Sequence, residues 1–305
     1  MSEKLTPDLC VIGAGSGGLS VAAAAAMMRV PVVLIEKGEM GGDCLNHGCV
    51  PSKALIAAAH AAHAARGARR FGIDAGEPTA DFAHVRAHVH DVIATIAPND
   101  SQTRFEALGA KVIRAAGRFI SPREVEAGDY TIRARRFIIA TGSSPATLPI
   151  PGIETVKVLT NETIFDLGEL PRHLVIIGGG PIGVELAQAF RRLGAEVTVL
   201  EAARMLSRED PELADVALRR LREEGVRLRE GVSITRIDPI GDGGGARIVL
   251  AGAPEETIEA SHLLVAAGRR PNVDNLGLEA AGVKYSRKGI EVSKSLRTSN
   301  RRIYA

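Results

Sequence analysis

The chain has 305 residues, of which 45% are apolar and 24% charged, a composition typical of a soluble globular protein large enough for two domains. Its 38 basic and 36 acidic residues give a formal net charge of +2, so nothing in the charge points to nucleic acid or an anionic membrane as a partner. The longest apolar run, residues 21–28, is too short to span a bilayer and follows no basic leader, so we expect a cytoplasmic protein. The chain has only three cysteines, so we expect no disulfide framework.

The first pattern along the chain is a nucleotide-binding unit over residues 9–37. It reads as an apolar strand, a glycine turn, a helix and a second strand that ends in a carboxylate. Gly13 makes the tight turn, Gly15 lets the backbone approach a pyrophosphate, and Gly18 lets helix and strand pack closely. The helix N-terminus faces the phosphates, and Glu36 accepts hydrogen bonds from the adenosine ribose. The unit therefore predicts a dinucleotide site.

Two cysteines follow this unit almost immediately, in segment 41–53, which reads GGDCLNHGCVPSK. Cys44 and Cys49 are separated by four residues, and their place beside a nucleotide site favours a redox pair over a structural staple. A metal site that includes His47 is disfavoured, because no second Cys or His pair follows at the spacing of a zinc finger. A nearby cation or helix N-terminus is expected to lower the pKa of the reactive thiol. The third cysteine, Cys10, is interpreted as a small buried hydrophobe of the first strand.

The middle of the chain contains a buried strand that runs into a glycine turn, residues 137–142, and a Pro-rich linker, residues 145–151. Residues 174–202 then align without gaps on residues 9–37. The residues that correspond to the three glycines and the acid are Gly178, Gly180, Gly183 and Glu201. Two ungapped copies make a chance glycine-rich turn a poor explanation, so we expect two bound dinucleotides.

Glu201 bears on the choice between NADH and NADPH. A carboxylate beside a 2′-phosphate costs a few kcal/mol at an effective dielectric of about 20, or roughly two orders of magnitude in affinity, so NADH is favoured. Arg204 follows closely and would offset part of this repulsion, which leaves NADPH as the less favoured alternative. Further on, residues 242–245 are interpreted as a hairpin loop rather than a phosphate cradle because no helix follows, and residues 263–272 repeat the strand and turn of the middle segment.

The segment 41–53 resembles the signature of the class I pyridine nucleotide–disulfide oxidoreductases, the family of dihydrolipoamide dehydrogenase, glutathione reductase and mercuric reductase. The resemblance implies an α/β fold with two doubly wound, three-layered nucleotide-binding domains. It places FAD on the N-terminal copy, and NAD(H) rather than NADP(H) on the second. The FAD-binding domain would comprise residues 1–150 and 270–305, and the NAD(P)-binding domain residues 151–269.

The resemblance also implies roles for the reactive side chains. Cys44 would be the thiol that exchanges with substrate, and Cys49 would be the thiol beside the flavin. The flavin would pass electrons from NAD(P)H to the disulfide of these two cysteines. Lys53 lies near the flavin and pairs with Glu185 of the second glycine-motif helix. Asp43 replaces the Thr that is usual beside the FAD pyrophosphate. Further cofactor contacts are implied for Lys37, Gly42, Asp43, Lys53, Gly117, Ala140, Thr141, Gly142, Val232, Gly268 and Arg269.

The substrate and the extent of the chain follow from the same resemblance. Within the family, the amino-acid sequence of the cysteine segment favours a dihydrolipoamide dehydrogenase-like or mercuric reductase-like enzyme. Such an enzyme would act on a small-molecule disulfide, a dithiol or a thiol-bound metal. Relatives continue past the last residue, Ala305, into the rest of the flavin site and a dimerisation domain, so we expect a C-terminally truncated member of a homodimeric family. Such a chain is expected to bind NAD readily and FAD weakly, and to turn over disulfides poorly. Two alternatives stay open: a catalytically inactive dinucleotide-binding fragment, and an NADH oxidase.

Overall fold

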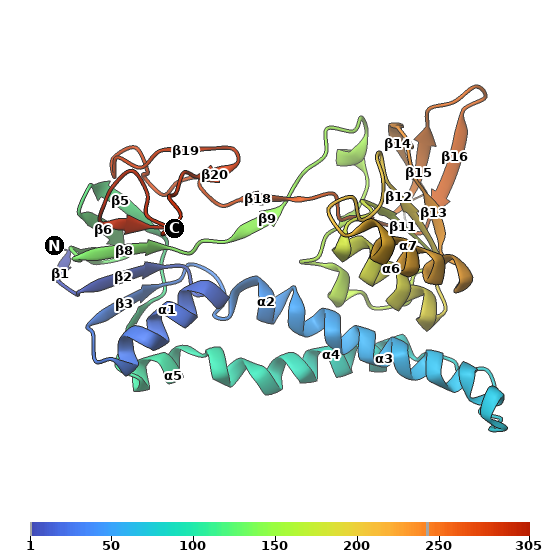
Figure 1. Cartoon of the computed structure of the whole chain (residues 1–305), viewed down its shortest axis with the longest axis horizontal. Coiled ribbons are helices and arrows are strands. Elements are labelled where there is room, and N and C mark those ends of the chain that lie inside the picture. The colour runs from blue at the N-terminus through green and yellow to red at the C-terminus, as the bar shows by residue number, and fades with distance from the viewer. Residues whose placement is uncertain (1, 242–243) are drawn as a thin grey trace. The chain divides into compact units, whose positions relative to one another are not determined.

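The computed structural model describes residues 2–241 and 244–305, and it separates into two compact units (Figure 1). Unit 1 contains residues 2–49, 93–144 and 269–305, and unit 2 contains residues 50–92, 145–241 and 244–268. This division differs from the expected domain limits chiefly in residues 50–92, which the sequence groups with the FAD-binding part and which the structure places in unit 2. Which unit binds which cofactor stays a prediction.

Unit 1 is built on a parallel five-stranded sheet with the strand order β21-β8-β2-β3-β4. Its strands are β2 (Leu9–Ile12), β3 (Val32–Ile35), β4 (Lys111–Ile113), β8 (Arg136–Ile139) and β21 (Ile303–Tyr304). A four-stranded sheet in the order β1-β7-β6-β5 comprises β1 (Glu3–Leu5), β5 (Gly117–Ser121), β6 (Glu124–Ala127) and β7 (Tyr130–Ile132). The helices within this unit are α1 (Ser16–Met27), α2 (Gly42–Asn46) and α5 (Gln102–Ala107).

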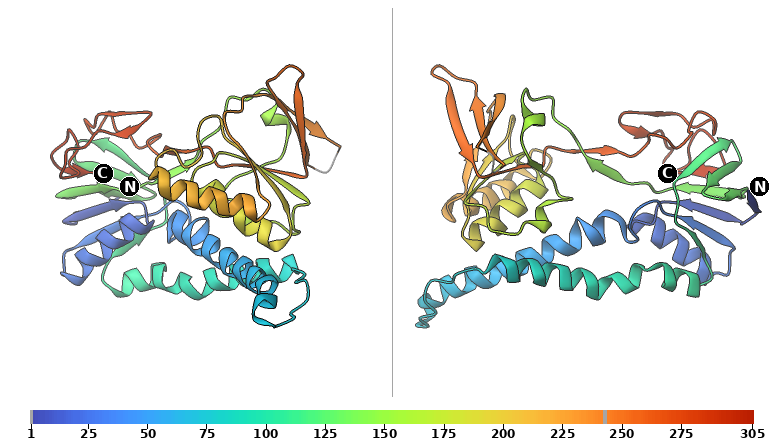
Figure 2. Two further views of the ribbon diagram at one scale, coloured as in Figure 1. Left: turned by 45° about the vertical axis from the view of Figure 1, so that its right-hand side comes forward. Right: turned by 180° about the vertical axis from the view of Figure 1, so that it is seen from behind.

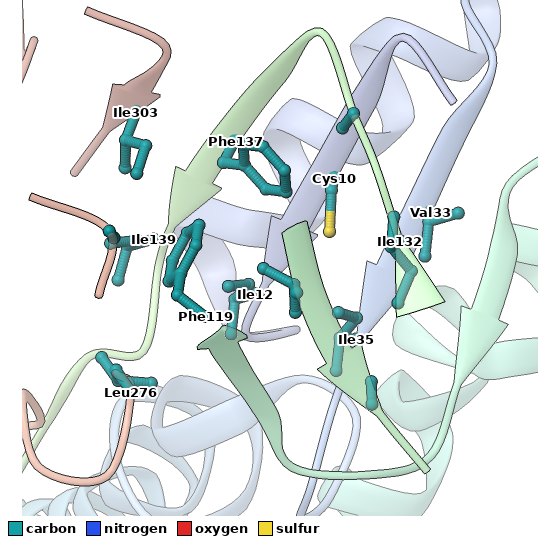
Figure 3. Packing of buried hydrophobic residues seen from close by; sticks show 14 of the residues in the cluster. Cys10, Ile12, Val33, Ile35, Phe119, Ile132, Phe137, Ile139, Leu276 and Ile303 are labelled. Carbon is teal, nitrogen blue, oxygen red and sulfur yellow. The ribbon is translucent and has the colours of Figure 1, made fainter. Parts of the chain in front are cut away.

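The parallel sheet of unit 1 buries both faces, as its uninterrupted apolar strands predict. On one face, along which α1 lies in both views of Figure 2, Val11 and Leu34 pack in a cluster with residues of α1 and α5. On the other face, Cys10 packs in a cluster with Phe119 and Phe137 from the two sheets (Figure 3). The two phenylalanine rings meet edge to face, with centroids 5.2 Å apart. The expected burial of Cys10 is confirmed, and unit 1 has three layers.

Unit 2 repeats this architecture. Its parallel sheet, in the order β10-β17-β11-β12-β13, comprises β10 (Val158–Leu159), β11 (His173–Ile177), β12 (Glu196–Leu200), β13 (Arg227–Arg229) and β17 (His262–Val265). An antiparallel sheet of β14 (Ile234–Ile240), β15 (Gly245–Leu250) and β16 (Glu256–Ala260) packs on it through a cluster that includes Val175 and Ile248. Helices α6 (Pro181–Leu193) and α7 (Pro211–Glu223) contact β11, β12 and β13. β14 and β15 pair as a hairpin, and residues 242 and 243 of its expected loop lie outside the described residues.

Two long helices, α3 (Cys49–Gly67) and α4 (Phe82–Ile96), each contain a boundary between the units. Pro51 lies in the first turn of α3, where a missing N–H breaks no helical hydrogen bond. The remaining strands are β9 (Ser143–Pro145), which pairs with β18 (Arg269–Pro271), and β19 (Tyr285–Ser286), which pairs with β20 (Gly289–Ile290). Across residues 2–241 and 244–305, none of the helices combines the length and apolar character needed to cross a bilayer.

Candidate active site

In the first glycine motif, the surrounding backbone leaves no room for a side chain at the first and third glycines. Gly13 has φ +105°, a conformation that favours glycine, and an added Cβ would lie 2.3 Å from the carbonyl oxygen of Ala140, directly after β8. A Cβ at Gly18 would lie 1.8 Å from the carbonyl oxygen of Gly13. Both positions therefore need glycine for the fold itself, because the neighbouring atoms are backbone and have little freedom to move.

The second motif likewise leaves no room for a side chain at its first and third glycines. Gly178 has φ +116°, and an added Cβ would lie 2.5 Å from the carbonyl oxygen of Ala266, directly after β17. A Cβ at Gly183 would lie 2.1 Å from the carbonyl oxygen of Gly178. The correspondence seen in the sequence thus extends to the contacts of each copy, and the first and third glycines have the packing roles that were expected.

The fold does not require glycine at the middle position of either motif. Gly15 and Gly180 have φ −81° and −77°, values that any residue adopts. A Cβ at Gly15 would have Gly42 Cα as its nearest atom, at 3.9 Å, and one at Gly180 would meet no heavy atom of the described residues within 4 Å. Each is the N-cap residue of its helix, α1 or α6, where backbone N–H groups need acceptors. An open glycine at this point fits a pyrophosphate that approaches the backbone, as FAD and NAD would.

The two acids lie at the mouths of these turns. Glu36 accepts hydrogen bonds from the backbone N–H groups of Ala14, at 2.6 Å, and Gly38, at 2.7 Å. Its counterpart Glu201 accepts the equivalent two bonds at 2.8 and 2.9 Å. Each carboxylate is therefore fixed by backbone donors, which the sequence does not predict. A carboxylate has about four lone-pair sites, so both retain the capacity to accept ribose hydroxyls.

The segment after β8 is joined to the segment after β18 by a small polar network. Thr141 Oγ1 donates to the carbonyl oxygen of Asn272, at 2.7 Å, and Asn272 Nδ2 donates to the carbonyl oxygen of Thr141, at 2.9 Å. Ser144 Oγ donates to Asn272 Oδ1 at 3.0 Å. Asn272 was not among the predicted site residues, although the string RRPN that contains it follows the second strand and turn.

The other residues implied as cofactor contacts are distributed over both units. Gly117 lies in the core of unit 1, where a Cβ would be 3.3 Å from side-chain atoms of Ile12 and Ile35, so packing alone accounts for this glycine. Unit 1 also holds Lys37, Gly42, Asp43, Thr141, Gly142 and Arg269. Unit 2 holds Lys53, Val232 and Gly268. Their contacts with FAD or NAD stay predictions.

The two cysteines lie on consecutive helices, Cys44 in α2 and Cys49 as the first residue of α3. Both are free thiols; Cys44 is half-buried and Cys49 is exposed. The Cys44 thiol forms a hydrogen bond with Cys49. This pair is tied to the first nucleotide motif through Gly42, because a Cβ there would lie 2.7 Å from Gly15 Cα. The expected association of the cysteine segment with the glycine turn is thus present as direct backbone packing.

The expectation that a cation or helix N-terminus lowers the thiol pKa is wrong for Cys44. The pKa of Cys44 is raised to about 11, chiefly by burial and also by the side chain of Cys49 and the negative charge of Asp100. The physical reason is that burial disfavours the charged thiolate and outweighs the hydrogen bond with the backbone of Cys49, which lowers the pKa. Burial likewise raises the pKa of the Cys10 thiol.

A direct prediction follows for the reduced chain without cofactors. Because the thiolate is the nucleophile, alkylation of Cys44 by iodoacetamide should accelerate about tenfold for each pH unit until the pH approaches the pKa of about 11. Mass spectrometry of the Cys44 peptide as a function of pH and time measures this. A rate that levels off near neutral pH would show that the thiolate is stabilised instead.

Lys53 and Glu185 form the ion pair that the resemblance implies. Lys53 Nζ, on α3, lies 2.6 Å from Glu185 Oε2, on α6, and both residues belong to unit 2. The side chains are 59% and 46% exposed. An ion pair this exposed contributes only about 0–1 kcal/mol to stability, so folding does not account for it. A role of Lys53 beside a flavin stays a prediction.

Two glycine motifs of this geometry, with a two-cysteine segment packed through Gly42 against the first, are typical of proteins that bind dinucleotides and use thiols. Residues 7–305 match the family described as pyridine nucleotide-disulphide oxidoreductase. The chain therefore belongs to this family, whose members are oxidoreductases that use FAD and NAD(P)H. The family predicted from segment 41–53 and the predicted fold class are both confirmed.

Several relatives are similar over nearly the whole chain. It is 39% identical to a mercuric reductase of Streptomyces lividans, over 98% of this chain and 64% of that protein, and 37% identical to a dihydrolipoyl dehydrogenase of Thermus scotoductus, over 98% and 65%. A solved Cu(II) complex of the HOCl-induced flavoprotein disulfide reductase RclA from Escherichia coli superposes with a TM-score of 0.84 at 30% identity, over 97% of this chain and 65% of that one. The chain thus spans less than two thirds of the length of these three relatives.

Proposed function

We propose that the protein is an NADH-dependent oxidoreductase in which Cys44 and Cys49 alternate between a dithiol and a disulfide. The observation that carries this proposal is the place of the two thiols, in α2 and at the start of α3, within a segment whose Gly42 packs on Gly15 of the first nucleotide motif. A thiol pair at such a place is positioned for electron exchange with a bound dinucleotide rather than for folding. FAD, when bound, would supply the two-electron link between the nicotinamide and this pair.

The cysteine pair would deliver its electrons by thiol–disulfide exchange. One thiolate attacks the substrate disulfide to form a mixed disulfide, and the second cysteine then displaces the second substrate thiol. The balanced result is one Cys44–Cys49 disulfide and two substrate thiols. Cys49 is the more exposed of the two residues in the chain without cofactors. The assignment of Cys44 as the exchanging thiol is a proposal from the family resemblance, and single variants distinguish the two cysteines.

The acceptor that we propose is a small disulfide or a soft metal ion held by thiolates. Two adjacent thiols suit both, because thiolates exchange with disulfides and bind soft cations tightly. The names of the relatives, which include mercuric reductases and dihydrolipoyl dehydrogenases, support these two acceptor classes. The homodimer that the resemblance implies, and the cytoplasmic location expected from the sequence composition, are further proposals.

The test is anaerobic NADH oxidation by the FAD-loaded chain with a panel of acceptors. Lipoamide, oxidised glutathione and Hg(II) bound by dithiothreitol would be compared with no acceptor. We expect NADH oxidation that depends on at least one acceptor and stops after a single turnover without one. Oxidation that requires oxygen but no acceptor would support an NADH oxidase instead, and the absence of any electron uptake would support an inactive nucleotide-binding chain.

Glu201 gives a second prediction, on nucleotide choice. Arg204, the cation that would offset repulsion of a 2′-phosphate, has its Nη2 atom 3.0 Å from Asp215 Oδ1 on α7, so it is engaged by another acid. We expect the chain to bind NADH about 100-fold more tightly than NADPH, as the repulsion between Glu201 and a phosphate requires. Glu201→Gln should reduce this ratio to about tenfold or less. Calorimetric titration with each nucleotide measures both values, and equal affinities of the unmodified chain for the two would contradict the prediction.

A further inference from the structure

The turn between the two cysteines is closed by Asp43. The backbone N–H of His47 donates to the carbonyl oxygen of Asp43 at 2.8 Å, which ends helix α2. A Cβ at Gly48 would lie 2.9 Å from that same oxygen and 3.2 Å from Asp43 Oδ2. Asp43 is therefore the sequence neighbour of Cys44 and packs against the residue that precedes Cys49. The backbone carbonyl and the side chain of Asp43 thus both lie beside the turn that leads to Cys49.

Arg269 holds Asp43 from a distant part of the same unit. Its Nη2 atom lies 3.2 Å from Asp43 Oδ1. Ser143 fixes the guanidinium on another side, because Arg269 Nε donates to Ser143 Oγ at 2.8 Å and Nη2 donates to the Ser143 carbonyl oxygen at 2.5 Å. The Arg269 side chain is only 23% exposed and that of Asp43 is 43% exposed. This pair is thus more buried than most surface ion pairs, and its cation has little freedom to leave.

We propose that Asp43 and Arg269 form a positioning pair that presets the turn between Cys44 and Cys49 for closure into a disulfide. The proposal rests on the redox role proposed above for these cysteines. Two thiols held in one arrangement react as if at very high local concentration, and a looser turn forfeits part of that advantage. The pair therefore raises the equilibrium constant for Cys44–Cys49 disulfide formation. Arg269, the first residue of β18, in this way controls the thiols of a segment near the N-terminus.

Charge alone would leave a different signature. A cation near a thiolate stabilises the reduced form and an anion destabilises it. If only charge mattered, Arg269→Gln would favour the disulfide and Asp43→Asn would disfavour it. A positioning pair predicts that both substitutions disfavour the disulfide, and that the double variant is no worse than either single one, because each already breaks the same contact.

The experiment equilibrates the chain, without FAD or nucleotide, in anaerobic glutathione buffers. Each Cys44–Cys49 disulfide formed converts one oxidised glutathione into two reduced molecules, and alkylation with mass spectrometry counts the remaining thiols. We expect the equilibrium constant to fall about tenfold in Asp43→Asn and in Arg269→Gln, and by no more in the double variant. Asp43→Glu keeps the charge and moves the carboxylate by one methylene, so it should also lower the constant.

Arg270→Gln is the matched control, because it removes the neighbouring exposed ion pair with Asp274 (2.5 Å) and should leave the constant unchanged. Thermal unfolding of each variant shows whether it folds. If Asp43→Asn or Arg269→Gln does not fold, the equilibrium constant of Asp43→Glu, which keeps the charge of the site, tests the proposal instead. A constant within about twofold of the original in the folded variants, or shifts in opposite directions, would overturn the positioning pair. If the unmodified chain forms no Cys44–Cys49 disulfide in any buffer, the proposed function itself fails.

Discussion

Cys44→Ser is expected to lower acceptor-dependent NADH oxidation by the FAD-loaded chain at least ~10³-fold, because a single thiol cannot form the intramolecular disulfide and a serine hydroxyl cannot exchange with one. Cys49→Ser should have an effect of the same size for the same reason. The reductive step should survive in both variants, since neither changes the glycine motifs or the acids Glu36 and Glu201. The measurement compares anaerobic NADH consumption with and without acceptor in the two variants.

Cys10→Ala is the control for loss of a thiol. Cys10 is fully buried in β2 among apolar residues, so the substitution should cost some stability and leave acceptor reduction intact. Acceptor reduction that persists in Cys44→Ser at more than about a tenth of the original rate would remove the cysteine pair from the electron path. The product thiols should be counted in parallel, so that direct reduction of the acceptor by free flavin is recognised.

The second large effect is a contrast between two glycines of the same motif. Gly178→Ala places a Cβ 2.5 Å from the carbonyl oxygen of Ala266 at φ +116°, so it should lower the free energy of unfolding of unit 2 by about 3 kcal/mol or more. Gly180→Ala meets no described heavy atom within 4 Å and sits at an ordinary φ, so its cost should stay below about 1 kcal/mol, the scale of an N-cap change. It should nevertheless weaken NADH binding at least about tenfold, because the methyl group would stand where the pyrophosphate approaches.

Urea unfolding followed by circular dichroism and calorimetric titration with NADH separate these two outcomes. Gly168→Ala serves as a control outside the motif, because a Cβ there would meet no described heavy atom within 4 Å and its φ lies outside the left-handed region. If Gly180→Ala binds NADH as tightly as the unmodified chain, the open glycine does not mark the phosphate site and the nucleotide assignment of unit 2 loses its structural support.

The glycine motifs were predictable because their causes are local. Gly13 and Gly178 are required by the backbone within one strand–turn–helix unit and by the strand that returns beside it. The strands and helices of each unit were predictable for the same reason, because the spacing of apolar residues along the sequence indicates each element. The pair of Lys53 and Glu185 was found only through resemblance, because no local pattern relates two polar residues of different helices.

The features that the sequence did not reveal depend on how the chain packs in three dimensions. The resemblance implied Asp43 and Arg269 separately as cofactor contacts, and no shared periodicity relates the two residues to each other. The raised pKa of Cys44 comes from its own burial, the bond with Cys49 and the charge of Asp100, none of which the spacing of the cysteines encodes. The sequence of residues 50–92 does not say which unit they join, and they were grouped with the FAD-binding part.

The most direct test of the account is to add NADH anaerobically to the FAD-loaded, oxidised chain and then count its thiols by alkylation and mass spectrometry. The account predicts that Cys44 and Cys49 both become alkylated, with one pair of new thiols for each NADH oxidised, while Cys10 is unchanged. Oxidation of NADH with Cys44 and Cys49 still joined as a disulfide would contradict it, because electrons would then reach the flavin and never the cysteines.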